Sequence, residues 1–136
     1  MTPAGYSGTP LGKKLGIKPG HVVWLSEAPD YLSPLLAAEV GAHYTQEAPE
    51  RADVILLFAT SMESFTRRFP AAAKLLVKNG GLWVFWPKRT SGAQTDLTEN
   101  LIREFGLACR LVDNKVCAVD ETWSGLRFVI RIQDRA

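Results

Sequence analysis

Hydrophobic residues in this chain gather in short continuous runs that are separated by segments of mixed polarity. The runs at 21–26, 53–59 and 82–86 have the length of β-strands and contain few polar residues. Runs of this kind are typical of strands in a parallel sheet that is covered on both faces. A weaker run at 42–46 predicts a short strand between the first two. The pattern therefore predicts an α/β domain built on a mostly parallel sheet.

Three segments between the strands carry apolar residues at helical spacing, together with start and stop signals. The apolar positions are Leu35 and Leu36 in the first segment; Met62, Phe65, Phe69, Ala72 and Leu76 in the second; and Leu97, Leu101, Ile102 and Phe105 in the third. The expected caps and end signals are Ser33 with Gly41, Ser61 with Asn79, and Thr95 or Asp96 with Gly106. A kink is expected at Pro70. We therefore expect three helices that pack their apolar sides on the sheet.

The last quarter of the chain predicts a hairpin. Residues 108–119 are expected to be extended, with an interruption at the turn-prone residues 113–115. Residues 122–125 then predict a reverse turn into a final strand at 126–132. The hairpin would close the domain.

The chain has 136 residues, of which 46% are hydrophobic, enough for one core. We expect residues 1–20, rich in Gly, Pro and Lys, to form an N-terminal arm and residues 21–136 to form a single domain. No apolar run approaches the roughly 20 residues that a membrane helix needs. The chain also does not open with a basic start followed by an apolar stretch. We therefore expect a soluble cytoplasmic protein with no membrane partner.

Charge and the rarer residue types narrow the function classes. The net charge of +2 arises from 16 basic and 14 acidic residues that are interleaved, which is too mild to indicate nucleic acid. Cys109 and Cys117 lack a Cys-x-x-Cys spacing, so buried free thiols are expected. His21 and His43 belong to no ligand-spacing motif. No metal site is predicted.

The turn after the first strand lacks glycine. Ser26 is followed by Glu27, Ala28, Pro29 and Asp30. Nucleotide sites on parallel α/β sheets use glycines in this turn, because bare backbone N–H groups must come close to the ligand. Side chains in the turn would keep such a ligand away, so we expect no nucleotide cofactor.

Local segments add a resemblance to a known fold. Residues 15–20 (LGIKPG) and 76–85 (LVKNGGLWVF) are similar to segments of the class I methyltransferases, and so is the alternation of strands and helices that ends in a hairpin. The resemblance implies a Rossmann-like three-layer sandwich, mostly parallel with a C-terminal antiparallel hairpin. One strand and one helix of the family's topology are missing. Because the family's glycines and acidic partner are absent after Ser26, the resemblance also implies loss of cofactor binding.

A second resemblance covers nearly the whole chain. The segments 4–8, 86–88, 95–100 and 112–125 resemble, in this order, a family of small bacterial proteins catalogued as Domain of Unknown Function 3052. The resemblance implies a bacterial source and the same fold. It carries no activity to transfer.

Polar residues follow the strands where a ligand would bind. In an open parallel sheet, ligands bind outside the carboxyl ends of the strands. Residues 120–123 would join this edge if the strand ending at Val119 runs parallel to the others. The candidate ligand-binding residues are Ser26, Glu27, Ser61, Lys88, Arg89, Ser91, Asp120, Glu121 and Trp123.

Lys88 and Arg89 are the first choice among these candidates. They follow a buried strand and precede the expected N-terminus of the third helix, where two cations and unpaired N–H groups favour an anion. The alternative is that Lys88 forms an ion pair with Asp120 or Glu121 across the edge.

Two tryptophans are candidates for stacking on a planar ligand. Trp86 alternates with Val84 and is expected in the core. Trp123 lies in a turn, where it either seals the hairpin or contacts a ligand or another chain.

Three functions remain open. The leading hypothesis is a binding or regulatory module whose partner is a small anionic ligand or another protein, with the oligomeric state undecided. The second is a small enzyme, including a divergent methyltransferase, that acts on an anionic metabolite through Lys88, Arg89, Asp120 and Glu121. The third is nucleic-acid binding through the basic arm and the long helix, which the mild charge disfavours. Its residues would be Lys13, Lys14, Lys18, Arg67, Arg68, Lys74 and Lys78.

Overall fold

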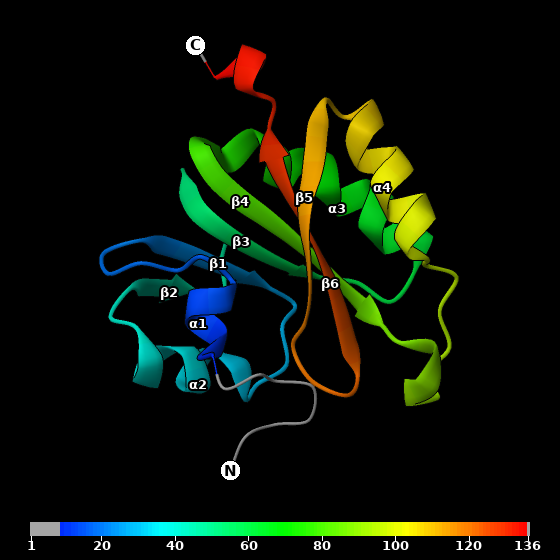
Figure 1. Cartoon of the computed structure of the whole chain (residues 1–136), viewed down its shortest axis with the longest axis horizontal. Coiled ribbons are helices and arrows are strands. Elements are labelled where there is room, and N and C mark those ends of the chain that lie inside the picture. The colour runs from blue at the N-terminus through cyan, green and yellow to red at the C-terminus, as the bar shows by residue number, and fades with distance from the viewer. Residues whose placement is uncertain (1–8, 136) are drawn as a thin grey trace.

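The computed structural model describes residues 9–135, and its centre is one six-stranded sheet with the order β2-β1-β3-β4-β6-β5 (Figure 1). The strands are β1 (Val22–Ser26), β2 (His43–Thr45), β3 (Ala52–Phe58), β4 (Leu76–Pro87), β5 (Leu111–Ala118) and β6 (Trp123–Ile130). The helices are α1 (Leu11–Lys14), α2 (Leu32–Glu39), α3 (Met62–Leu75) and α4 (Glu99–Ala108), with short 3₁₀ turns η1 (Arg89–Ser91) and η2 (Ile132–Asp134).

The sheet is mixed, as the sequence predicts. Strands β1 to β4 are parallel, and β6 is antiparallel to both β4 and β5. Strand β5 therefore runs in the same direction as β4. The predicted α/β fold, mostly parallel with a C-terminal antiparallel hairpin, is confirmed.

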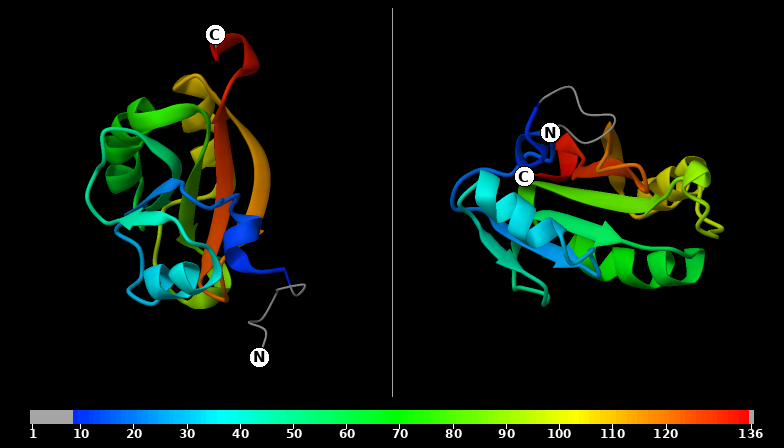
Figure 2. Two further views of the ribbon diagram at one scale, coloured as in Figure 1. Left: turned by 90° about the vertical axis from the view of Figure 1, so that its left-hand side faces the viewer. Right: turned by 90° about the horizontal axis from the view of Figure 1, so that it is seen from below.

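Helices cover both faces of the sheet. Phe65 and Phe69 of α3 and Ile102 of α4 pack on one face, whereas Leu15 and Leu36, from the α1 and α2 side, pack on the other. Figure 2 shows α3 and α1 on opposite sides of the sheet. This arrangement explains the continuous apolar run of β3, because its alternate residues enter two different cores.

The described part of the N-terminal segment packs onto the sheet. Leu11, Leu15 and Ile17 are buried, and Trp83 Nε1 donates a hydrogen bond to the Leu15 carbonyl at 3.0 Å. The motif at 4–8 lies outside the described residues. No helix within residues 9–135 is long and apolar enough to cross a membrane.

The boundary between α3 and β4 differs from the prediction. The helix ends at Leu75 rather than at Asn79, and β4 begins at Leu76 and includes Gly80 and Gly81. A Cβ on Gly80 would lie 2.6 Å from the Asp53 carbonyl oxygen. Gly80 therefore allows close packing on β3, and Gly81 makes room for the Arg127 side chain, instead of ending the helix.

Two predicted helix caps are also wrong. Thr98, not Thr95 or Asp96, caps α4 by accepting a hydrogen bond from Leu101 N at 3.2 Å. Gly106 lies inside α4 rather than at its end. Glycine is needed there because the ring of Phe128 occupies the space that a side chain would take.

Helix α2 also departs from its predicted start and inward face. It has Tyr31 at the N-cap with no side-chain cap bond, so Ser33 is inside the helix. Leu36 is buried, but Leu35 is 40% exposed.

The expected turn at 113–115 is a β-bulge. Asp113 pairs with Phe128 and Lys115 pairs with Arg127, so Asn114 is an extra residue in a continuous β5. The reversal of the hairpin falls at residues 119–122, between β5 and β6. Because β5 runs parallel to β4, the condition for placing Asp120 at the strand-end edge is met.

Candidate functional site

The carboxyl ends of β1, β3 and β4, together with the β5–β6 turn, form the edge where the sequence analysis places a ligand. We call it the strand-end edge. The chain leaves β1 to form β2 on one side and later returns to form β3 on the other side. The reversal makes the ends of β1 and β3 the topological switch point, which is where open α/β sheets bind their ligands.

Arg68 of α3 occupies this switch point. Its Nη2 donates to the Ser26 carbonyl at 3.2 Å and to Ser26 Oγ at 2.8 Å. Its Nη1 donates to the Phe58 carbonyl at 2.8 Å and to Ser64 Oγ at 2.9 Å. The side chain is only 11% exposed. One guanidinium therefore joins the ends of β1 and β3.

The position of Arg68 follows from local rules. Ser61 caps α3 by accepting a hydrogen bond from Ser64 N at 3.2 Å, which fixes the start of the helix at this edge. Helical side chains lean toward the N-terminus of their helix. Arg68 lies between Phe65 and Phe69 in sequence, both buried, so its side chain follows the sheet surface back to the strand ends.

Glu27 forms an ion pair with Arg68 at the end of β1. Its carboxylate lies 3.3 Å from Arg68 Nε, and its backbone has a φ of 56°. Left-handed backbone at a non-glycine residue costs about 1–2 kcal/mol. Burial lowers the pKa of Arg68, while the Glu27 carboxylate raises it. Arginine keeps its proton in proteins, so the Arg68–Glu27 contact is an ion pair.

These residues do not fit an adenosine-type cofactor. Such a ligand needs bare amides after β1 and room above the ends of β1 and β3. Here the turn carries side chains, and the Arg68 guanidinium takes up the Ser26 and Phe58 carbonyls. The open cavity beside the turn, lined by residues 27–30, has a volume of about 260 Å³, which is below the usual range of small-molecule sites. Arg68, expected on a basic helix surface, instead lies at the switch point, a role that was not predicted.

The N-terminus of α3 is satisfied from within the chain. Asp96 Oδ1 accepts a hydrogen bond from Met62 N at 2.8 Å, and Thr95 Oγ1 donates to the Thr60 carbonyl at 2.8 Å. Asp96 thus places a carboxylate where an external anion would bind. Ser61 is engaged in the cap described above.

Asp120 and Trp123 stabilise the β5–β6 turn. Asp120 Oδ1 accepts from Thr122 N at 2.8 Å and from Trp123 N at 3.1 Å, and its other oxygen bonds the Tyr31 hydroxyl. Trp123 packs edge-to-face on Phe58 with ring centroids 5.0 Å apart. Trp86 is in the core, as predicted. Trp123 therefore packs on β3 at the start of β6.

Lys88 and Arg89 form no ion pair with any residue in 9–135, so the alternative pairing of Lys88 with Asp120 or Glu121 is absent there. Arg89 lies between two open cavities of about 640 and 440 Å³. Glu121 is exposed, and Ser91 Oγ donates to the Lys88 carbonyl at 2.6 Å. As ligand contacts, the nine candidate residues remain a prediction.

The proposed nucleic-acid surface is divided by the fold. Lys18 and Lys78 line one cavity, since Lys78 lies in β4 rather than on the long helix. The segment with Lys13 and Lys14 packs on the α1 face of the sheet, and α3 packs on the opposite face. Arg68 points into the strand-end edge. The arm and α3 therefore do not make one basic surface.

Solved structures provide a comparison for the whole arrangement. The ribosomal protein L11 methylase of Lactobacillus delbrueckii has a TM-score of 0.61 at 10% identity, over 88% of this chain and 74% of that one. The magnesium protoporphyrin IX methyltransferase of Synechocystis, with bound SAH, scores 0.62 at 12% identity over 88% and 78%. A SAM-dependent methyltransferase of Aquifex aeolicus scores 0.61 at 14% identity over 88% and 87%.

This chain has a methyltransferase-like Rossmann fold. At such low identity the likeness shows the fold alone. A scan against protein-family models finds no match, and a search of curated proteins finds no similar sequence. The resemblance to Domain of Unknown Function 3052 therefore stays a prediction.

Proposed function

We propose that this protein is a non-catalytic binding or regulatory module built on a methyltransferase-like fold, with its nucleotide crevice closed by its own side chains. The observation that carries the proposal is the Arg68 guanidinium, which bonds Ser26 and Phe58 across the switch point. The partner would be a small anionic ligand or an acidic protein surface.

The energetics of the closure support this proposal. A nucleotide at the switch point would have to displace Arg68 from its four hydrogen bonds. If only two of them are lost at about 1.5 kcal/mol each, affinity falls by about two orders of magnitude. A cofactor that would otherwise bind at micromolar concentration becomes a weak ligand.

Lys88 and Arg89 supply the contact surface for the partner. Neither forms an ion pair with a carboxylate of the described chain, and Arg89 lines two open cavities at this edge. Two adjacent cations on an open surface favour an anionic partner and speed its encounter.

The same two cations favour a second candidate, a small enzyme for an anionic metabolite. Its weak point is the proton-transfer group. Asp120 is bonded to two backbone amides and to Tyr31, which leaves it in a structural role. We therefore rank this candidate below the binding module.

Calorimetric titration with SAM, SAH, NAD and ATP tests the proposal. We expect no saturable binding by the wild-type protein. The Arg68→Ala variant should bind these ligands at least as well as the wild type does. The matched Arg67→Ala variant should behave as wild type, because Arg67 is 63% exposed and, within residues 9–135, its ion pair is with Glu63. Saturable micromolar binding of any of the four ligands to the wild type would overturn the proposal.

A further inference from the structure

A further cavity lies at the opposite edge of the sheet, where the parallel strands begin. Its volume is about 450 Å³, and it is lined by the segment before β1, the first residues of β3 and β4, and the middle of β6. The polar side chains of the lining are Lys18, His21, Asp53, Lys78, Asn79 and Arg127. None of them belongs to the strand-end edge.

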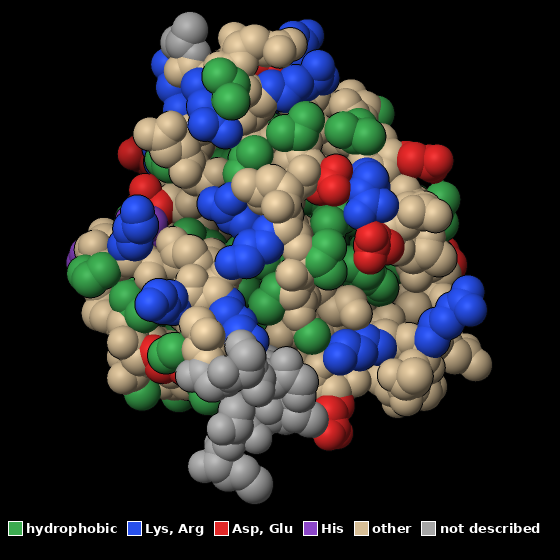
Figure 3. Space-filling model, viewed as in Figure 1, with side chains coloured by type: hydrophobic (Ala, Val, Ile, Leu, Met, Phe, Trp, Pro, Cys, Tyr) green, Lys and Arg blue, Asp and Glu red, His purple; other side chains and the backbone are tan. Residues whose placement is uncertain are grey.

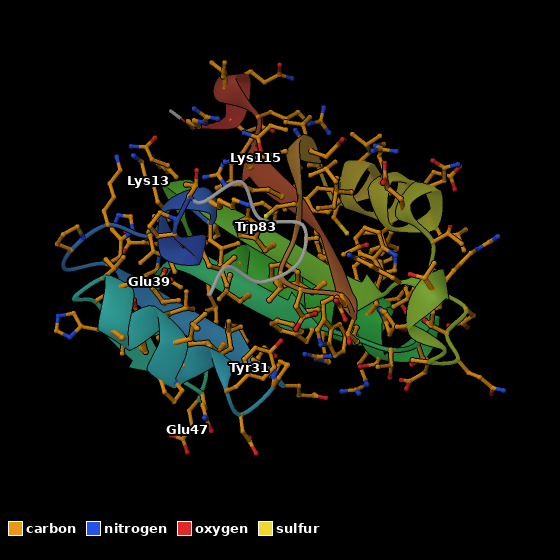
Figure 4. The ribbon with its side chains drawn as sticks, turned by 60° about the horizontal axis from the view of Figure 1, so that its bottom comes forward. Lys13, Tyr31, Glu39, Glu47, Trp83 and Lys115 are labelled. Atoms are coloured by element: carbon orange, nitrogen blue, oxygen red, sulfur yellow. The ribbon has the colours of Figure 1, made fainter. Side chains whose placement is uncertain are left out.

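Arg127 is held in this cavity by close packing. Its guanidinium lies against the backbone of Gly81, where an added Cβ would be 2.4 Å from Nε. Its Nη1 donates to Asn114 Oδ1 at 3.3 Å. In register, Arg127 pairs with Trp83 and Lys115, so all three lie on the α1 face, as Figure 4 shows for Trp83 and Lys115.

The charge of Arg127 is not balanced within the described chain. The side chain is half-buried, and no carboxylate in residues 9–135 forms an ion pair with it. Burial lowers the pKa of Arg127, and the nearby Arg135 lowers it further. Fully buried charges are ordinarily paired because removing them from water is costly, and a half-buried guanidinium bears part of that cost. An anion in the cavity would supply the missing partner.

The rest of the lining is also rich in cations and donors. Lys18 and Lys78 add two positive charges. Asp53 is the one carboxylate in the described lining, and its Oδ2 accepts a hydrogen bond from Val22 N at 2.8 Å. His21 Nδ1 accepts from Lys18 N at 3.2 Å, which leaves the other ring nitrogen as the donor.

The surroundings have the same sign. Figure 3 shows Lys and Arg side chains gathered on the face that carries α1 and β6. Lys115 Nζ donates to the Lys14 carbonyl at 3.0 Å, which holds two basic residues close together beside Arg127. Such a field raises the local concentration of anions.

We propose that this cavity binds the phosphate group of a small phosphorylated metabolite, with Arg127 as its main ligand. A guanidinium fork matches the geometry of phosphate oxygens, and lysine adds a point charge. The volume exceeds that of a phosphate alone and falls in the usual range of small-molecule sites. The site is independent of the closure at Arg68, so either proposal can fail without the other.

The test is an NMR titration of the ¹⁵N-labelled protein with glucose 6-phosphate, inorganic phosphate and glucose. We expect saturable shifts from both phosphate compounds, centred on the amides of Gly16, Asn79 and Gly81, and none from glucose. Arg127→Gln should weaken binding at least about ten-fold, as expected for one charge-assisted hydrogen bond.

Two further variants keep the test decisive. Lys18→Gln changes an exposed cavity residue and should weaken binding about three-fold even if Arg127→Gln folds poorly. Lys74→Gln, exposed on α3, should leave binding unchanged. The proposal is overturned by unchanged binding in both cavity variants, by shifts centred on Lys88 and Arg89, by equal shifts with glucose, or by preferential binding of duplex DNA.

Discussion

Replacement of Arg68 with alanine should destabilise the fold as well as open the switch point. The change removes the donors to the Ser26 and Phe58 carbonyls at the ends of two central strands. A buried carbonyl left without a partner costs about 1–3 kcal/mol, and water entering the vacated space recovers part of this. We expect the free energy of unfolding to fall by about 2–4 kcal/mol.

Urea unfolding followed by tryptophan fluorescence measures this loss. With a slope of about 2 kcal/mol per molar, the midpoint should fall by about 1–2 M. Arg67→Ala should change stability by less than about 0.5 kcal/mol, because an exposed (i, i+4) pair contributes little. Arg68→Lys keeps the charge without the fork and should restore less than half of the loss. If Arg68→Ala is as stable as Arg67→Ala, Arg68 does not join the strand ends.

Three other changes test separate parts of the structure. Gly106→Ala should destabilise the protein by about 1–3 kcal/mol in thermal unfolding, because the new Cβ would lie 2.1 Å from the Phe128 ring. Gly41→Ala is the control, because a Cβ there meets no atom within 4 Å. Equal melting temperatures of the two variants would refute the packing of Phe128 against Gly106. Glu27→Gly should leave the free energy of unfolding in urea unchanged or raise it by up to about 1 kcal/mol, because the backbone φ of 56° suits glycine. A loss above about 1 kcal/mol would show that the ion pair between Glu27 and Arg68 outweighs the backbone strain at Glu27. Burial raises the pKa of the Cys117 thiol in the folded protein. The free energy of unfolding should therefore be unaffected below the ordinary thiol pKa of about 8.5 and should fall as the pH rises from there through the pKa of the folded protein, because the thiolate is less favourable in the folded state. Iodoacetamide should therefore modify Cys117 more slowly than free cysteine at pH 7.5, and equal rates would contradict the burial.

The sheet could be predicted because its signal is local. Strands β1, β3 and β4 have faces in two cores, so their hydrophobic residues are continuous and easily found in the sequence. Strand β5 runs parallel to β4 because β6 pairs antiparallel with both of them. This direction was the condition for placing Asp120 at the strand-end edge.

The errors arise where a distant contact overrides a local preference. Asp96 is a good helix cap, but it accepts from Met62 of α3 rather than from its own helix. Gly106 resembles a helix end, but its missing side chain makes room for Phe128. Asn114 resembles a turn residue, but the pairing with β6 continues on both sides of it.

Part of the site could be predicted and part could not. The strand-end edge could be predicted from the rule that ligands bind outside the carboxyl ends of parallel strands. The same rule placed Ser26, Glu27 and Asp120 at this edge. Arg68 was missed because its partners are carbonyls 10 and 42 residues away, which only the folded sheet brings together. Its position between two buried phenylalanines was the available signal.

A crystal structure grown with excess SAH tests the central claim most directly. We expect Arg68 to remain bonded to Ser26 and Phe58, with no nucleotide density above the ends of β1 and β3. A nucleotide lying over residues 27–30, with the Arg68 guanidinium displaced from both carbonyls, would contradict it.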